Sequence, residues 1–154
     1  MRTARQLMRR HVVVLAPGQR LAEVRDVMRL GRLRQLLVAE DGRVVGELSH
    51  RAVCRLYLEA ATQLDRARLL AADQLPVHQL MMPFQGGVSP DARLHEITAL
   101  LIARGCGYVP VVPGDADPHL LGIITEQDLL RLALMTPPPA AVAHRRRPAA
   151  DRSP

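Results

Sequence analysis

Hydrophobic residues recur along the chain in two matching series. The apolar run at residues 12–15 ends just before Pro17, and a weaker run at residues 86–88 ends just before Pro90. Both runs predict short strands, because a residue that precedes proline is pushed toward extended backbone. Apolar residues at the spacing of one helical face follow, namely Leu21, Val24 and Met28 in the first series and Leu94, Ile97 and Leu101 in the second. Each residue of the second helix lies 73 positions after its counterpart, so the pattern predicts two copies of one unit.

A β-hairpin is predicted after each helix, from the β-rich runs at residues 36–38 and 109–112. Turn residues follow, a short set at 40–42 in the first copy and a longer set at 113–118 in the second. The extra residues raise the separation to 76, so that Ser49 matches Thr125 at the start of a second helix. Each copy is thus predicted as strand, helix, hairpin and helix, which is an α/β (α+β) fold.

The segment between the copies carries a further helical pattern. Apolar residues from position 53 to 67 share one face, and we predict a single long helix from Ser49 toward Asp73 that stops at Pro76. Its charged opposite face indicates a solvated side, with partner binding as the alternative. The chain accordingly divides into a first repeat at 1–58, an inter-repeat helix or linker at 59–75, a second repeat at 76–135 and a tail at 136–154. The tail is rich in proline and arginine and is expected to be disordered.

Composition and charge narrow the possible functions. Aromatic residues make up 2% of the 154 residues, which excludes a nucleic-acid surface built from several stacked aromatics. The formal net charge is +6, but residues 1–10 contribute +4 and residues 136–154 contribute +3, which leaves −1 for the body of the chain. Nucleic acid is therefore not the expected partner of that body. No apolar run approaches the roughly 20 residues that span a bilayer, and no signal-peptide pattern is present, so we expect a cytoplasmic protein without membrane association.

The most suggestive chemistry lies at Thr125 and Asp128. These residues follow a predicted strand and begin a helix, where free backbone N–H groups favour phosphate. A carboxylate at position 128 could accept hydrogen bonds from both hydroxyls of a ribose. The same spacing also fits a capping box, in which the hydroxyl caps the helix and the acid bonds back without any ligand. Both interpretations are open on these residues alone.

With the repeat established, the sequence resembles a tandem cystathionine-β-synthase (CBS) domain pair, or Bateman module. Three pairs of motifs carry the resemblance, at residues 6–8 and 79–81, 36–38 and 109–111, and 44–49 and 121–128. The resemblance implies two repeats packed sheet to sheet with pseudo-twofold symmetry, and two clefts that commonly bind an adenosine-containing ligand such as AMP, ADP, ATP or S-adenosylmethionine. It also implies a stand-alone regulatory module, often a homodimer, that senses this ligand and modulates a partner protein which the sequence does not identify.

The resemblance assigns roles to residues of the second copy. Thr125 matches the residue that caps the helix and contacts phosphate, and Asp128 matches the acid that holds the ribose hydroxyls. The other expected ligand-binding residues are the adenine-lining Tyr108, Val109 and Pro110, the entering segment Val88 and Ser89, and Gly122. An adenine nucleotide or S-adenosylmethionine is the expected ligand, and no cofactor is required.

The first copy departs from this pattern. Ser49 keeps the cap, but Ala52 stands where the second copy has Asp128, and alanine cannot hold a ribose. Weaker candidates for a phosphate contact in this copy are His50, Arg51, Arg34 and the neighbouring Gln35. We therefore predict one good site at most, formed around the second copy.

Other chemistries find little support in the sequence. The six histidines form no i, i+4 pair, and Cys54 and Cys106 do not occupy matching positions, so neither a metal site nor a disulfide is expected. No nucleophile lies beside an evident base, so we do not expect an enzyme. Two alternatives to a nucleotide sensor stay open. One is a dimeric scaffold with vestigial clefts, and the other is a nucleic-acid binder that uses the basic ends.

Overall fold

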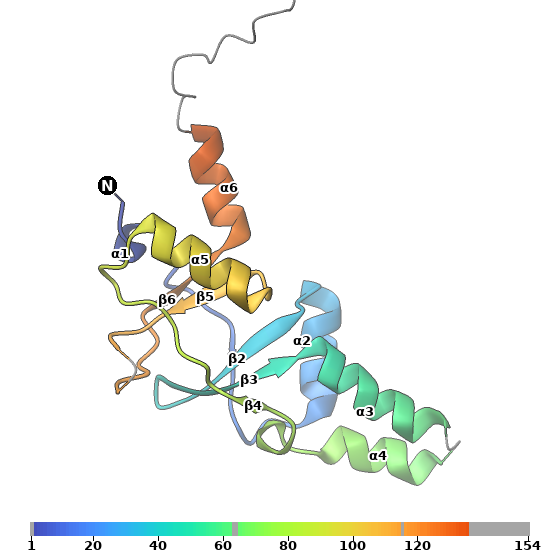
Figure 1. The fold of residues 1–154 in the computed structure, drawn as a ribbon. Coiled ribbons are helices and arrows are strands. Elements are labelled where there is room, and N and C mark those ends of the chain that lie inside the picture. The colour runs from blue at the N-terminus through green and yellow to red at the C-terminus, as the bar shows by residue number, and fades with distance from the viewer. Residues whose placement is uncertain (1, 63–64, 115, 136–154) are drawn as a thin grey trace, which may run out of the picture.

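The computed structural model describes residues 2–62, 65–114 and 116–135, and it contains the two repeats as two small sheets with flanking helices (Figure 1). The first repeat consists of β1 (Val14–Leu15), α2 (Leu21–Gly31), β2 (Gln35–Glu40), β3 (Arg43–Ser49) and α3 (His50–Thr62). The second repeat consists of α5 (Leu94–Arg104), β5 (Tyr108–Val111), β6 (Gly122–Thr125) and α6 (Glu126–Met135). The predicted α/β class and the order of helix, hairpin and helix are confirmed.

The two sheets share one pairing pattern. β1 lies parallel to β2 with Leu15 opposite Val38, and the second repeat has the matching parallel bridge between Val88 and Val111. β2 and β3 are antiparallel, as are β5 and β6. The turn between β2 and β3 has positive φ at Asp41 and Gly42, which suits the twist of a tight hairpin. The weak apolar run of the second copy forms a single bridge to β5, whereas β1 of the first copy pairs with β2 over two residues.

The leading segment of each repeat packs on the opposite repeat, which the sequence pattern did not predict. α1 (Ala4–Leu7) is tied to the second repeat by a 2.9 Å hydrogen bond from Ala4 N to Ala92 O. The short helix η1 (Val77–Gln79) is tied to the first repeat by a 2.8 Å hydrogen bond from Val77 N to Gln19 O. Donors and acceptors of these two bonds are each 73 residues apart, so the exchange follows the pseudo-twofold symmetry.

The next residues of each leading segment pair with the opposite hairpin. β4 (Met82–Pro83) pairs with β3 at Glu47 and Gly46, and Arg9 forms the matching bridge to Ile123 in β6. A Cβ atom at Gly122 would lie 2.5 Å from Arg9 O, and one at Gly46 would lie 2.7 Å from Met82 O. Glycine is therefore required at these two matching positions, because the crossing backbone passes directly over them.

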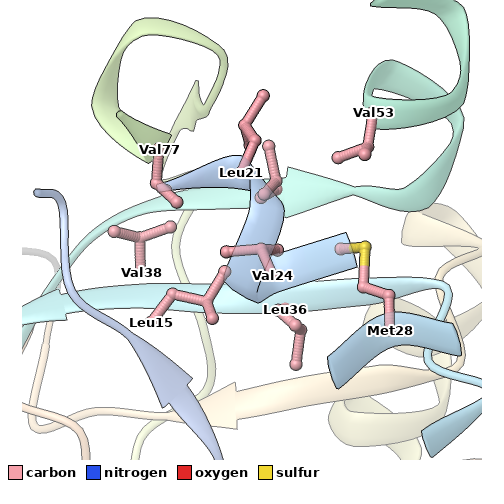
Figure 2. Packing of buried hydrophobic residues seen from close by; sticks show 9 residues of the cluster. Leu15, Leu21, Val24, Met28, Leu36, Val38, Val53 and Val77 are labelled. Carbon is pink, nitrogen blue, oxygen red and sulfur yellow. The ribbon is translucent and has the colours of Figure 1, made fainter. Parts of the chain in front are cut away.

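Three apolar clusters fill the interior. Figure 2 shows the cluster of the first repeat, which includes Leu15, Leu21, Val24, Met28, Leu36, Val38, Val53 and Val77. The cluster of the second repeat includes Ile97, Leu101, Val109 and Ile124, together with Ala4 of the leading segment. A third cluster around Leu37, Val44 and Tyr108 joins the two sheets. The predicted helix faces are confirmed except at Leu94, which is 36% exposed.

The inter-repeat segment contains two helices, so the prediction of one long helix from Ser49 toward Asp73 is wrong. α3 ends at Thr62, and α4 (Arg66–Gln74) begins after Asp65, which accepts a 2.9 Å hydrogen bond from Ala67 N. An aspartate at this position caps a new helix start, although the apolar periodicity continues across it. The two helices lie side by side and are joined by a 2.6 Å hydrogen bond from Tyr57 Oη to Asp73 Oδ1 (Figure 1).

Within the described ranges, no helix combines the length and the apolar character that a membrane span requires. The disorder predicted for residues 136–154 lies outside the described residues. The division of the chain at residues 58 and 75 stays a prediction.

Candidate functional site

A cleft with a volume of about 760 Å³ opens between the two repeats. The first repeat lines it with residues 9, 11–13 and 31–37, which belong to the leading segment and to the junction of α2 with β2. The second repeat lines it with residues 105–108, 123 and 125–127, where α5 meets β5 and where β6 meets α6. The volume lies in the range of small-molecule sites, and the lining combines apolar side chains with a few polar ones.

Thr125 and Asp128 form the capping box at the cleft wall. Asp128 Oδ2 accepts hydrogen bonds from Thr125 N at 3.0 Å and from Thr125 Oγ1 at 2.7 Å, and Asp128 N donates to Thr125 Oγ1 at 3.3 Å. The other carboxylate oxygen, Oδ1, accepts from Arg9 Nε at 2.7 Å and from Arg9 Nη2 at 2.6 Å. The capping interpretation of the motif is thus realised in the structure, and the ribose-binding role of Asp128 stays a prediction.

The surroundings of Asp128 hold its carboxyl group in the ionised form. Burial would raise the pKa of this group, but hydrogen bonds from Arg9 and Thr125 outweigh burial and lower the pKa below 3.8. The Asp128 side chain is 11% exposed, whereas that of Arg9 is 44% exposed. The arginine lines the cleft, whereas the carboxylate that it binds is not among the described lining residues.

The matching position on the other side of the pseudo-twofold axis is filled by side chains. Arg104 stands where the open cleft has Gly31, and Glu47 stands where the open cleft has Ile123. Arg104 and Glu47 form an ion pair with side chains that are 9% and 5% exposed. Arg104 Nη1 also donates to Gly86 O at 2.9 Å. Buried side chains therefore occupy these two positions in the counterpart of the open cleft.

Tyr108 completes this buried group. Its hydroxyl donates to Glu47 Oε1 at 3.3 Å, and the guanidinium of Arg104 lies 5.9 Å from the centre of its ring. Burial and the neighbouring Glu47 carboxylate raise the pKa of Tyr108, so its phenol stays protonated and acts as a donor. Because Tyr108 also lines the open cleft, one residue contacts both sides of the inter-repeat interface.

A comparison with protein families identifies the repeats. The model of the CBS domain matches residues 4–59 and residues 87–135. The chain belongs to the CBS domain family. The match covers both hairpins and most of each repeat, so the tandem CBS pair predicted from the sequence is confirmed.

Relatives of this CBS pair include longer proteins. Protein MJ1225 from Methanocaldococcus jannaschii is 27% identical over 124 residues, which cover 79% of this chain and 44% of that protein. Its crystal structure, described as that of a candidate archaeal homolog of γ-AMPK, has a TM-score of 0.73 at 25% identity and covers 85% of this chain and 47% of that one. An A-adding tRNA nucleotidyltransferase from Geobacter sulfurreducens is 27% identical over 130 residues, which cover 84% of this chain and 13% of that enzyme.

A solved structure of similar length shares the fold. The crystal structure of CBSX2 in complex with AMP has a TM-score of 0.69 at 24% identity. The similarity covers 87% of this chain and 97% of that one. The CBS pair thus corresponds to less than half of MJ1225 and to nearly all of CBSX2.

The fold of the CBS pair brings only some of the predicted site residues to the open cleft. Thr125, Tyr108, Arg34 and Gln35 line it, and Asp128 lies behind Arg9. Besides Asp128, five residues predicted for the second repeat are not among the described lining residues, namely the buried Val88, Val109 and Pro110, the exposed Ser89, and Gly122, which faces the Arg9 backbone. Val88 pairs with Val111 inside its own repeat, and residues 11–13 and β2 of the first repeat supply the facing part of the lining.

The weaker first-copy candidates lie at the start of α3. Ser49 Oγ accepts a 3.1 Å hydrogen bond from Ala52 N, so the predicted cap is present. His50 is exposed, with its Nε2 atom 3.4 Å from Cys54 Sγ, and Arg51 is also exposed. None of these three residues is among the described lining residues of the open cleft.

Two residues of the cleft lining, Arg9 and Cys106, are not among the site residues predicted from the sequence. Arg9 belongs to a basic segment at residues 1–10, and no local signal in the sequence points to its contact with Asp128 across 119 positions. Cys106 lines the cleft and donates from Sγ to Tyr108 O at 3.3 Å. Among the described residues, no group of three or more histidine, cysteine, aspartate or glutamate side chains is arranged to hold a metal ion.

Proposed function

We propose that this CBS pair is a regulatory module that binds an adenine nucleotide in the open cleft and thereby changes its affinity for a partner protein. One observation carries the proposal. The cleft joins the capped start of α6, at Thr125, to three arginines of the first repeat, Arg9, Arg32 and Arg34. A helix start and guanidinium groups together favour a phosphorylated ligand.

The chain offers a group for each part of such a ligand. Arg34 and the N–H groups at the start of α6 would hold phosphate, and Asp128 would accept the ribose hydroxyls. Tyr108, Val12 and Ile123 supply apolar surface for the base. Gly122 and the buried residues Val88, Val109 and Pro110 would act by shaping the second repeat. The AMP in the CBSX2 structure supports a ligand of this kind for the shared fold.

The proposed role is regulatory, and the chain is not proposed to catalyse a reaction. The similarity to the nucleotidyltransferase covers 13% of that enzyme, so it concerns a small part of a much longer chain. A ligand that binds one packing of the two repeats better than another would shift the population between them. A partner protein that contacts both repeats would respond to that shift.

We propose that the module forms a homodimer. Large apolar side chains are exposed on α5 and α6, with Ile102 76%, Leu130 63% and Leu134 86% exposed. Leu58, which matches Leu134 in the first repeat, is 63% exposed, and α6 extends away from both sheets (Figure 1). A second copy would cover such surface symmetrically. Light scattering should give a dimer whose mass halves in Leu134→Glu, and a monomeric wild-type chain would contradict this proposal.

The experiment that tests the proposed function is a thermal melt against AMP, ADP, ATP, NAD, S-adenosylmethionine and GTP, each with and without magnesium. A ligand at one hundred times its dissociation constant should stabilise the fold by about 2.7 kcal/mol. The proposal predicts such a shift for an adenine nucleotide and its loss in Asp128→Ala. If no compound shifts the melt, the proposal fails, and a scaffold with vestigial clefts explains the fold better.

A further inference from the structure

Asp128 has no free acceptor position while Arg9 is bound to it. A carboxylate offers about four lone-pair sites. Oδ2 already accepts two hydrogen bonds from Thr125, and Oδ1 accepts two from Arg9. A ribose diol that binds Asp128 must therefore displace either the helix cap or Arg9. Arg9 is the group that can leave, because its side chain is 44% exposed while its backbone stays paired with Ile123.

The two repeats provide an internal comparison for this pair. The position that matches Asp128 in the first repeat holds Ala52, and the position that matches Arg9 holds Met82. The side where Glu47 and Arg104 lie therefore lacks a counterpart of Arg9 and a counterpart of Asp128. The arginine accompanies the acid at the open cleft, which indicates that the two residues act as a unit.

A second arginine of the cleft is kept at a structural cost. Arg32 ends α2 with φ 50, in the left-handed region, whereas the matching end of α5 has Gly105 with φ 60. A side chain at such a position costs about 1 kcal/mol relative to glycine. The side chain of Arg32 lines the cleft. Of the acidic residues that the structure describes, Glu126 alone lines the cleft beside Arg9, Arg32 and Arg34.

From these relationships we infer that the open cleft selects phosphorylated ribonucleotides over adenosine and S-adenosylmethionine, and that Arg9 sets this selection. The inference rests on the proposed function and narrows its ligand class. Adenosine must break the Arg9–Asp128 ion pair and offers Arg9 no anion in return. A nucleotide gives the displaced guanidinium a phosphate, with which arginine forms strong paired hydrogen bonds. S-adenosylmethionine carries a sulfonium, an ammonium and a single carboxylate, so it brings a net positive charge to a cleft that is lined by three arginines.

The test is titration calorimetry of adenosine, AMP and S-adenosylmethionine with three proteins: the wild type, Arg9→Met and Arg10→Met. Arg9→Met copies the methionine of the matching position, so the strand pairing is kept. Arg10→Met removes the same charge from an exposed neighbour outside the cleft lining. The wild type and Arg10→Met should bind AMP at least ten times more tightly than adenosine. In Arg9→Met this ratio should fall at least fivefold, through tighter adenosine and weaker AMP binding.

The outcomes separate the inference from the proposed function. If AMP binds the wild type but the ratio is the same in Arg9→Met, or if S-adenosylmethionine binds the wild type as tightly as AMP, the inference is overturned and the proposed function stands. If none of the three compounds binds any of the proteins, and ADP and ATP do not bind the wild type either, the proposed function fails and the inference fails with it. Arg9→Gln provides the same comparison if the methionine variant does not fold.

Discussion

Glu47 of β3 and Arg104 of α5 form an ion pair buried between the two repeats, on the side opposite the open cleft. Glu47 also accepts a hydrogen bond from Tyr108, and Arg104 donates to the backbone of Gly86. At the open cleft the matching positions hold Ile123 and Gly31, which leave space. The ion pair thus explains why side chains fill one of two symmetry-related positions between the repeats while the other position is an open cleft.

Arg104→Met should lower the free energy of unfolding by about 3–5 kcal/mol, because it leaves the buried Glu47 carboxylate without its partner. Urea unfolding measures this loss. The double variant Glu47→Leu/Arg104→Met should recover most of the loss, since an apolar pair carries no desolvation penalty. Arg29→Met removes an arginine whose side chain is 75% exposed and should cost less than about 1 kcal/mol. A small effect of Arg104→Met, equal to that of Arg29→Met, would show that the ion pair does not stabilise the interface.

Gly122→Ala should destabilise the fold by about 1–3 kcal/mol, because the new methyl group would overlap the Arg9 carbonyl of the crossing segment. Gly18→Ala is the matched control, since a Cβ atom there meets nothing within 4 Å. That control should be neutral or stabilise slightly by restricting the unfolded chain. Denaturant unfolding of the two variants provides the comparison, and equal stability would argue against the exchange of leading segments.

The order of helices and hairpins was predictable because it depends on local spacing. Leu21, Val24 and Met28 must share one face of any helix, and they are buried as that spacing indicates. The break before α4 was hidden because the apolar periodicity runs through it, although Asp65 is a recognisable cap. The exchange of leading segments could not be predicted, because residues 6–8 and 79–81 have the same pattern whichever repeat they cover.

The sequence motif placed Thr125 at the cleft and fixed its capping bond to Asp128, since both residues lie within one helical turn. It could not supply the partner of the acid, because Arg9 reaches Asp128 only through the exchange of leading segments. The predicted residues Val88 and Ser89 lie outside the described cleft lining, and Val88 pairs with Val111 of its own repeat. Tertiary contacts between distant residues decide these positions, and no local pattern encodes them.

Asp128→Asn should remove a contribution to the free energy of unfolding that the wild type has at neutral pH and loses as the pH falls. The folded pKa of Asp128 lies below its usual value of 3.8, so the ionised carboxylate stabilises the fold fully above that value. This stabilisation disappears as the pH falls through the folded pKa. The wild type should therefore exceed Asp128→Asn by about 1 kcal/mol from pH 5 to pH 8, and the difference should shrink below pH 4. Chemical unfolding across this range measures the difference, and one that grows toward low pH would contradict the account.

Arg32→Gly should raise stability while it weakens the binding of a phosphorylated nucleotide. Glycine relieves the left-handed backbone at φ 50, which should add about 1 kcal/mol to the free energy of unfolding. Loss of the guanidinium at the cleft should lower the affinity for AMP several-fold. Asp41 also has positive φ, but it lies in the hairpin turn away from the cleft lining, so Asp41→Gly should stabilise without affecting AMP. Equal AMP affinity in Arg32→Gly and the wild type would remove Arg32 from the site.

The central claim is that the CBS pair binds one nucleotide, in the cleft between Arg9 and Thr125, because Glu47 and Arg104 fill the opposite side. The most direct measurement is the stoichiometry of AMP binding by titration calorimetry at protein concentrations well above the dissociation constant. One AMP per chain is expected in the wild type and none in Asp128→Ala. Two molecules per chain, or one molecule that persists in Asp128→Ala, would contradict the account.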